Sequence, residues 1–193
     1  REIHHRVKNN LQTVSALLRL QSRRSSEEAV KVALAEAERR VQAIATVHAA
    51  LSQNVDESVD FDEVARTIVR MAGAIASTDH AVEVITTGSF GTIQADQAQA
   101  LATVLNELVA NSVEHGLADR DGLIEVRAER EGASMTVTVA DDGVGFVPGT
   151  PMSGLGTQIV HQMVRGELKG SIEWAPREGG GTLVTLHANL DPA

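Results

Sequence analysis

The sequence predicts an α+β fold in two parts, an antiparallel helical hairpin at residues 1–54 and an α/β domain at residues 55–193. Apolar residues recur at helical spacing through the first part, whereas segments that alternate apolar and polar residues occur only in the second. Glycine-rich turns also gather in the second part, after predicted strands. The polar run at residues 52–58 loses the helical pattern and marks the boundary.

Composition limits the classes of protein to which the chain can belong. Its 193 residues include 17 Lys or Arg and 26 Asp or Glu, and this net charge of −9 argues against broad nucleic-acid binding. The chain has no cysteine, which excludes disulfides and thiolate metal sites. It shows no apolar run of membrane-spanning length, no signal-like start and no initial methionine. We therefore expect a cytoplasmic segment, without a membrane anchor of its own, from the C-terminal part of a longer protein.

The first helix is predicted to run to about Arg24, with one apolar stripe formed by Ile3, Val7, Leu11, Val14 and Leu18. On a helical wheel, His5 and Asn9 project about 140° to 160° from the centre of this stripe, whereas His4 lies about 60° from it. An exposed imidazole with a polar side chain one turn along suits a nucleophile that meets a mobile donor. A solvated helix face explains the same pattern.

The second helix follows a polar turn at residues 25–28. Its apolar positions alternate in spacing between four and three, as in the seam of a bundle or coiled coil: Val30, Leu34, Ala37, Val41, Ile44, His48 and Leu51. A hairpin of two such helices is too thin to bury both seams. We therefore expect two copies of the chain to form a four-helix bundle, with His48 packed in its core.

The second part begins with a helix and a strand. Asp60 and Glu63 resemble a capping box, and amphipathic spacing predicts a helix over residues 61–75. Residues 82–87 are typical of a strand, and residues 88–93 fit either a loop or a short strand. These elements lead into a helix with an unusual set of polar residues.

Asp96 and Gln99 predict the N-terminal cap of this next helix. Farther along, Glu107, Asn111 and His115 recur every four residues, so that a carboxylate, an amide and an imidazole line one side. Oxygen ligands suit Mg²⁺, which takes few protein ligands and keeps waters and phosphate oxygens. A solvated helix face is an equally good interpretation of the spacing.

Two alternating strands, at residues 123–129 and 134–140, form a predicted hairpin that leads into an acidic turn at Asp141. Gly143 and Gly145 let the backbone turn and approach a ligand closely. A carboxylate held there can accept a hydrogen bond from an amino group such as that of adenine. A DxGxG pattern is also common in plain turns.

A second glycine turn, Gly154-Leu155-Gly156, precedes a predicted helix. The free amides and the dipole at such a helix start can hold phosphate, although the turn lacks the GK[ST] of a Walker A loop. Residues 172–174 and 182–188 supply closing strands around a run of three glycines. The single tryptophan, Trp174, is expected to pack in the domain rather than to stack on a base.

Five segments follow one another along the chain, and their order carries more information than any one of them: HHRVKNNLQ at 4–12, NELVANSVEHG at 106–116, DDGVGF at 141–146, GLGTQIV at 154–160 and GGGT at 179–182. They resemble the phosphoacceptor box and the N, G1, G2 and G3 boxes of two-component sensor histidine kinases. The first is similar to the HisKA-2/HWE-related subgroup, and the whole chain resembles cytosolic actinobacterial members with upstream GAF and PAS domains. The resemblance implies a dimerisation and phosphotransfer hairpin followed by a Bergerat-type (GHKL) ATP-binding sandwich.

The resemblance implies a role for each matching residue. His5 would be the phosphoacceptor, with Asn9 as its positioning partner. Asn111 would hold Mg²⁺, with Asn106 and Glu107 near the phosphates of ATP. His115 on the same helix would also bind the nucleotide. Asp141 would accept from the adenine amino group, Gly143 and Gly145 would let the base approach, and Thr182 would support the base through water. The amides of Gly154, Leu155 and Gly156 would hold phosphate as a lid at residues 147–153 closes.

The implied activity is ATP-dependent autophosphorylation of His5, followed by transfer of the phosphoryl group to an aspartate of a response regulator. Arg6 follows His5, where many relatives have an acidic residue that draws off the imidazole proton. The resemblance therefore does not identify the general base, and Arg6 is a candidate for neutralising the γ-phosphate. Glu114 stands where many relatives have lysine. Two alternatives use the same motifs: a related GHKL-type ATPase, and a non-catalytic ATP-binding scaffold that signals by shape.

Overall fold

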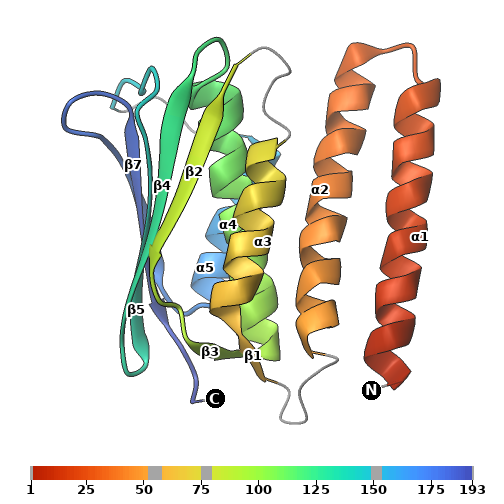
Figure 1. The fold of residues 1–193 in the computed structure, drawn as a ribbon, viewed down its shortest axis with the longest axis horizontal. Coiled ribbons are helices and arrows are strands. Elements are labelled where there is room, and N and C mark those ends of the chain that lie inside the picture. The colour runs from red at the N-terminus through yellow and green to blue at the C-terminus, as the bar shows by residue number, and fades with distance from the viewer. Residues whose placement is uncertain (1, 52–57, 75–79, 149–153, 193) are drawn as a thin grey trace.

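The computed structural model describes residues 2–51, 58–74, 80–148 and 154–192, excluding the side chains of residues 2–6, 8, 51 and 74. A helical hairpin stands beside an α/β sandwich (Figure 1). Helix α2 of the hairpin lies against the sandwich, and α1 lies on the far side of α2. None of the helices in the described ranges is both long and apolar enough to span a bilayer.

The hairpin consists of α1 (Glu2–Arg24) and α2 (Glu28–Leu51), as the periodicity predicts. Ser25 closes the turn by accepting a hydrogen bond from the Glu27 N–H at 3.2 Å. A polar cluster fixes the register of the two helices: Ser15 is buried, donates to Glu38 at 3.3 Å and accepts from Gln42 at 2.8 Å, while Arg19 Nε donates to Glu38 at 2.9 Å.

The hairpin leaves part of its apolar surface exposed. On α1, Asn9 faces solvent as the helical wheel predicts, and Gln12 is exposed as well. Large apolar side chains are exposed as well, with Leu17 at 57% and the others being Val14, Leu20, Val30 and Val32. Exposed apolar side chains on a helix suit an interaction site, and the burial of these residues by a second copy stays a prediction.

The sandwich is built from elements of three to seventeen residues in mixed order. Its main sheet has the strand order β2-β4-β5-β7-β6. Strand β2 pairs in parallel with β4, and the other pairs are antiparallel. The elements are β1 (Ser58–Asp60), α3 (Phe61–Ala74), β2 (Val82–Gly88), β3 (Thr92–Gln94), α4 (Ala95–Asn111), a π-helical turn η1 (Ser112–Gly116), β4 (Gly122–Glu131), β5 (Ser134–Asp141), α5 (Leu155–Gly166), β6 (Ser171–Pro176) and β7 (Thr182–Asn189).

Helices α3, α4 and α5 cover one face of this sheet (Figure 1). The core between helices and sheet contains Leu101, Leu105, Ile124 and Leu186, all with no exposed surface. The predicted strands and helices of the second part are all present, and residues 88–93 include the first two residues of the short strand β3. Strand β3 pairs with β1 in a separate two-stranded sheet at the base of α3 and α4.

One helix start differs from the prediction. Asp60 behaves as predicted, since its Oδ1 accepts from the Asp62 N–H at 3.1 Å. The predicted cap at Asp96 is wrong, because α4 begins at Ala95 with Gln94 in the cap position and without a side-chain cap bond. Strand β3 runs directly into α4 and leaves no turn for Asp96 to close. Asp96 lies instead in the first turn, where its charge suits the helix dipole.

Candidate nucleotide and phosphotransfer site

A pocket lies where the end of α4 meets the turns around β5, β6 and β7. It is lined by residues from three of the predicted motif segments, at 106–116, 141–146 and 179–182, and by the strand that carries Trp174. The lining residues are Leu108, Asn111, Ser112, His115, Gly116, Asp141, Gly145, Phe146, Trp174, Thr182 and Val184. The structure therefore brings five of the predicted site residues together: Asn111, His115, Asp141, Gly145 and Thr182.

A change in helix type shapes one wall of the pocket. Helix α4 ends at Asn111 and continues as the π-helical turn η1, in which the Leu117 N–H donates to Ser112 O at 2.9 Å. Turns of this wider kind are rare and often occur at functional sites. Here the turn leaves Asn111 half-buried and His115 exposed at the pocket.

The buried carboxylate of Asp141 lies at the end of β5 and is only 2% exposed. Its Oδ1 accepts hydrogen bonds from the Gly143 N–H at 3.0 Å and the Thr182 N–H at 3.2 Å. Both bonds end on the same oxygen, which fixes the orientation of the carboxylate and leaves Oδ2 as the acceptor for a ligand. This geometry fits a hydrogen bond from the amino group of adenine.

Glycines allow three backbone segments to meet beneath this carboxylate. A Cβ on Gly143 would lie 2.2 Å from the Gly116 carbonyl oxygen, and one on Gly181 would lie 1.9 Å from the Asp141 carbonyl oxygen. Gly181 also has a φ of +98°, a conformation that side chains disfavour. Gly116 and Gly181 were absent from the predicted site, although both lie in the segments quoted for it.

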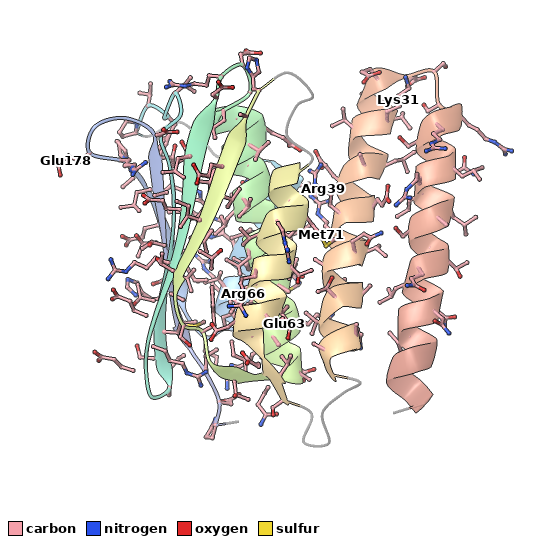
Figure 2. All side chains as sticks on the ribbon, in the orientation of Figure 1. Lys31, Arg39, Glu63, Arg66, Met71 and Glu178 are labelled. Carbon is pink, nitrogen blue, oxygen red and sulfur yellow. The ribbon has the colours of Figure 1, made fainter. Side chains whose placement is uncertain are left out.

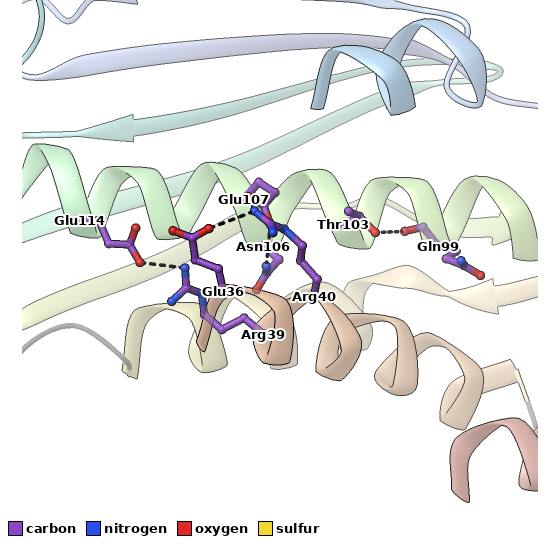
Figure 3. Close-up of polar contacts among 8 residues, drawn as sticks. All are labelled: Glu36, Arg39, Arg40, Gln99, Thr103, Asn106, Glu107 and Glu114. Atoms are coloured by element: carbon purple, nitrogen blue, oxygen red, sulfur yellow. Dashed lines mark hydrogen bonds and ion pairs between the residues drawn. The ribbon is translucent and has the colours of Figure 1, made fainter. Parts of the chain in front are cut away.

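Glu107 faces helix α2 (Figure 3). Its carboxylate, 5% exposed, accepts from Arg40 Nε at 2.7 Å and Arg40 Nη2 at 3.0 Å. The hydrogen bond with Glu107 raises the pKa of Arg40 above its usual value, and burial opposes this shift. Asn106 is buried and donates to Glu107 at 3.4 Å. Asn106 and Glu107 thus lie at the boundary with the hairpin, outside the lining of the pocket.

The glycine turn at the start of α5 lies beside Glu107. Gly154 occupies the cap position without a side-chain cap bond, and Leu155 is 62% exposed. A Cβ on Gly156 would lie 2.4 Å from Glu107 Oε2 and 3.6 Å from Arg40 Nη2. The open end of α5 therefore faces the Arg40–Glu107 pair rather than the walls around Asp141. Residues 149–153 of the predicted lid lie outside the described residues.

Two aromatic residues that line the pocket, Phe146 and Trp174, were not among the predicted site residues. Trp174 packs against His161 with a ring separation of 5.2 Å, as its predicted packing role requires, but it also lines the pocket together with Phe146. A lone tryptophan on a strand gives no sign of which cavity it faces. The pairing of β6 with β7 sets Trp174 opposite Val184, and both residues line the pocket.

The predicted phosphoacceptor residues lie on α1. The side chains of His5 and Arg6 are outside the described part of the chain, and Asn9 is exposed. Because α1 lies beyond α2, the structure does not bring Asn9 to the pocket (Figure 1). Between the hairpin and the sandwich, Arg39 on α2 and Met71 on α3 line a separate pocket with Asn106 (Figure 2).

The described residues contain no group of three or more His, Cys, Asp or Glu side chains that could hold a metal ion. This finding is compatible with Mg²⁺, which keeps waters and phosphate oxygens among its six ligands and takes few from the protein. The half-buried amide of Asn111 at the pocket fits that requirement.

Comparison with known proteins identifies the family. Residues 2–75 match the histidine kinase model HisKA_2, and residues 96–192 match the model described as Histidine kinase-, DNA gyrase B-, and HSP90-like ATPase. The chain belongs to the sensor histidine kinases. ATP binding follows from the second of these matches.

The curated relatives are sensor kinases as well. PdtaS of Mycolicibacterium smegmatis is 46% identical over 195 residues, which cover 98% of this chain and 39% of the relative. PdtaS of Mycobacterium tuberculosis H37Rv is 46% identical over 191 residues, which cover 96% of this chain and 38% of the relative. The chain thus spans about two-fifths of the length of these relatives.

A solved structure confirms the fold. The histidine kinase domain of the Erythrobacter litoralis EL346 blue-light activated kinase superimposes with a TM-score of 0.65 at 20% identity, covering 98% of this chain and 95% of that one. The predicted helical hairpin followed by a Bergerat-type ATP-binding sandwich is therefore the fold of this chain. At this identity the likeness speaks for the fold alone.

Proposed function

We propose that this chain is a kinase core that transfers the γ-phosphoryl group of ATP to His5 and then to an aspartate of a response regulator. One observation carries the proposal. A pocket with an oriented acceptor, Asp141 Oδ2, occurs in the same chain as a helix, α1, that carries the HHRVKNNLQ segment and on which Asn9 is exposed.

Adenine recognition would depend on the rigid floor of the pocket. Asp141 would accept from the adenine amino group, and Thr182, whose N–H already holds Asp141, would support the base through water. Gly143 and Gly145 give the base room to approach, while Phe146 and Trp174 form an apolar wall. A buried acceptor aimed at an amino group favours adenine over guanine, which presents a carbonyl at that position.

The phosphates would extend from this pocket toward α5. The amides of Gly154, Leu155 and Gly156 at its open N-terminus suit phosphate, because they have free N–H groups and the positive end of the dipole. Asn111 would hold Mg²⁺, which would offset the negative charge of the phosphates. His115 is exposed beside Asn111 and available to the same phosphates.

In the transfer step, a nitrogen of His5 forms a bond to the γ-phosphorus as the bond to the β–γ bridging oxygen breaks and ADP leaves with that electron pair. The imidazole gives up one proton. Asn9 would orient the ring and Arg6 would offset charge on the γ-phosphoryl group, with Glu107 a candidate for the base once it is released from Arg40. Such reactions depend mainly on positioning and electrostatics.

The proposed reaction also implies a second copy of the chain, a receiver domain as partner and a cellular compartment. The exposed apolar side chains of the hairpin, Leu17 and its neighbours, would be buried between two copies in a four-helix bundle. A receiver domain would then approach the helix that carries His5. Since the reaction consumes ATP, we place it in the cytoplasm.

The test uses ATP labelled at the γ-phosphorus and follows the label in protein and in free phosphate. A histidine kinase accumulates label on the protein in an acid-labile, base-stable form and passes it to a receiver domain. Release of free phosphate without labelled protein would favour the ATPase. Tight ATP binding without either product would favour the scaffold.

A further inference from the structure

Strand β2 (Val82–Gly88) forms an open edge of the main sheet. It stands first in the strand order β2-β4-β5-β7-β6, so no strand within the described ranges pairs with its outer side. Proteins protect open edges with short strands, lysine, proline or bulges, because an open edge can pair with another chain. Strand β2 has seven residues in unbroken register with β4 and contains neither lysine nor proline, whereas β6 at the opposite edge ends in Pro176. The unprotected edge of β2 therefore suits pairing with another chain.

The hydrogen bonds between β2 and β4 show which backbone groups of β2 are free. The Gly122 N–H donates to the Ala81 carbonyl at 3.1 Å, and at the other end the Ser89 N–H donates to β4 at 3.2 Å. In a parallel ladder, the N–H and C=O of one residue point to the same neighbour, and those of the next residue point the opposite way. The odd-numbered residues from Ala81 to Ser89 therefore face β4. The outward-facing N–H and C=O groups belong to Val82, Val84 and Thr86.

A groove with a volume of about 380 Å³, the α3–β2 groove, lies between this edge and helix α3. Its apolar lining consists of Val69 and Val84, with the hydroxyl-bearing Thr86 beside them. Its cationic lining consists of Arg66, labelled in Figure 2, and Arg70, which are both exposed on α3. Because Val84 and Thr86 contribute side chains to the groove and free backbone groups to the edge, the groove runs alongside the open edge.

Neither arginine of the α3–β2 groove forms an ion pair within the described part of the chain. Asp62, one turn before Arg66, is occupied elsewhere, because its carboxylate accepts from Ser89 Oγ at 2.7 Å and from the Phe90 N–H at 2.6 Å. Glu83 alternates onto the face of the sheet opposite α3. Two cations one turn apart on a helix repel each other. The groove thus presents two positive charges that have no local acceptor.

The spacing of the two arginines matches that of an extended chain. Four residues on a helix rise about 6 Å, and two residues along a strand rise about 6.8 Å, so side chains at alternate strand positions can meet both arginines. We propose that the α3–β2 groove is a docking site for an extended acidic segment of a partner protein. The segment adds to β2 as an antiparallel strand and pairs alternate carboxylates with Arg66 and Arg70. In this mode of recognition, main-chain hydrogen bonds supply affinity and side-chain contacts supply specificity.

Charge favours an acidic partner over a second copy of this chain. Antiparallel pairing of two β2 edges about a two-fold axis would place both α3 helices on the same face of the joined sheet. Both copies of Arg66 and Arg70 would then line the junction, where like charges oppose pairing. None of the groove residues lines the nucleotide pocket, so the docking site is independent of ATP binding and of transfer to His5.

Two fluorescein-labelled peptides test the docking site on the whole chain. The probe TETETET carries glutamate at alternate positions, and TKTKTKT is its cationic counterpart. Because the net charge of the chain is −9, general attraction favours TKTKTKT, and a preference for TETETET reports the groove. We expect the wild type to bind TETETET at least tenfold more tightly than TKTKTKT in fluorescence anisotropy, and R66E/R70E to reverse this preference.

The matched control is R23E/R24E, which makes the same change of charge at two exposed arginines of α1. This variant should keep the wild-type preference for TETETET. ATP affinity, measured on the same samples, should be equal in R66E/R70E and the wild type because the nucleotide pocket lies elsewhere. Equal affinities of the wild type for the two peptides, or equal losses of TETETET binding in the two double variants, would overturn the proposal.

N-methylated peptides separate strand addition from attraction between charges alone. Methyl groups on the glutamate nitrogens of TETETET block the hydrogen bonds to β2 and should weaken binding at least tenfold. Methyl groups on the threonine nitrogens, which face away from β2, should change the affinity less than about threefold. Equal effects of the two patterns would overturn strand addition. Rapid disulfide dimerisation of T86C, in a chain without other cysteines, would make a second copy the occupant and would also overturn the proposal.

Discussion

The nucleotide pocket and the hairpin–sandwich contact are built in different ways. The pocket is made largely of backbone: amides of Gly143 and Thr182 hold Asp141, and glycines let three loops meet beneath it. The hairpin–sandwich contact combines buried apolar side chains of α2, Ala43 and Val47, with long charged side chains, Arg39 and Arg40, that reach across to single carboxylates. Backbone packing has one arrangement, whereas a charged side chain can exchange partners. A kinase core needs both, a fixed site for ATP and a movable connection to the phosphoacceptor.

The largest effect is expected from changing the backbone of the pocket. Gly181→Ala would place a Cβ 1.9 Å from the Asp141 carbonyl oxygen at a φ of +98°. We expect a loss of more than about 3 kcal/mol in unfolding free energy, together with loss of ATP binding, measured by thermal unfolding and calorimetry. Gly166→Ala is the matched control, because a Cβ there meets no atom within 4 Å. Equal stability of the two variants would show that the three loops are not packed as described.

A smaller effect on stability and a large effect on chemistry are expected at Asn111. Asn111→Ala should lower the transfer rate about 100-fold at limiting Mg²⁺, since an oriented group that offsets phosphate charge is removed. Its half-buried amide contributes little to the core, so the unfolding temperature should change little. The same substitution at the exposed Asn189 serves as the control. Wild-type transfer by the Asn111 variant at limiting Mg²⁺ would remove this residue from the site.

The smallest effect is expected from a change in one hydrogen-bonding atom of the pocket. Asp141→Asn should weaken ATP binding about tenfold, because an oriented acceptor facing the adenine amino group becomes partly a donor, at a penalty of about 1–3 kcal/mol. Asp142→Asn is the control, since Asp142 binds the Leu123 N–H outside the pocket. Equal affinities of the wild-type protein for ATP and GTP would contradict the adenine contact.

The comparison also separates what the sequence could and could not predict. The pocket follows from local patterns, because a strand, an acidic residue and a glycine turn stand next to each other in the chain at Asp141. The hairpin–sandwich contact joins Arg40 to Glu107, 67 positions apart, and no periodicity reports such a pairing. The π-helical turn after Asn111 broke the regular spacing from which Glu107 and His115 were placed on one side. The wrong cap at Asp96 has a similar origin, since only the pairing of β3 with β1 explains where α4 begins.

The central claim is that His5 receives the phosphoryl group, and labelling of two neighbouring histidine variants tests it most directly. His5 is predicted to project away from the apolar stripe of α1, whereas His4 lies near its edge. With γ-labelled ATP, His5→Gln should give no acid-labile label, and His4→Gln should retain it, while both bind ATP as the wild type does because the pocket lies elsewhere. Persistent acid-labile labelling of His5→Gln, with none in His4→Gln, would contradict the account.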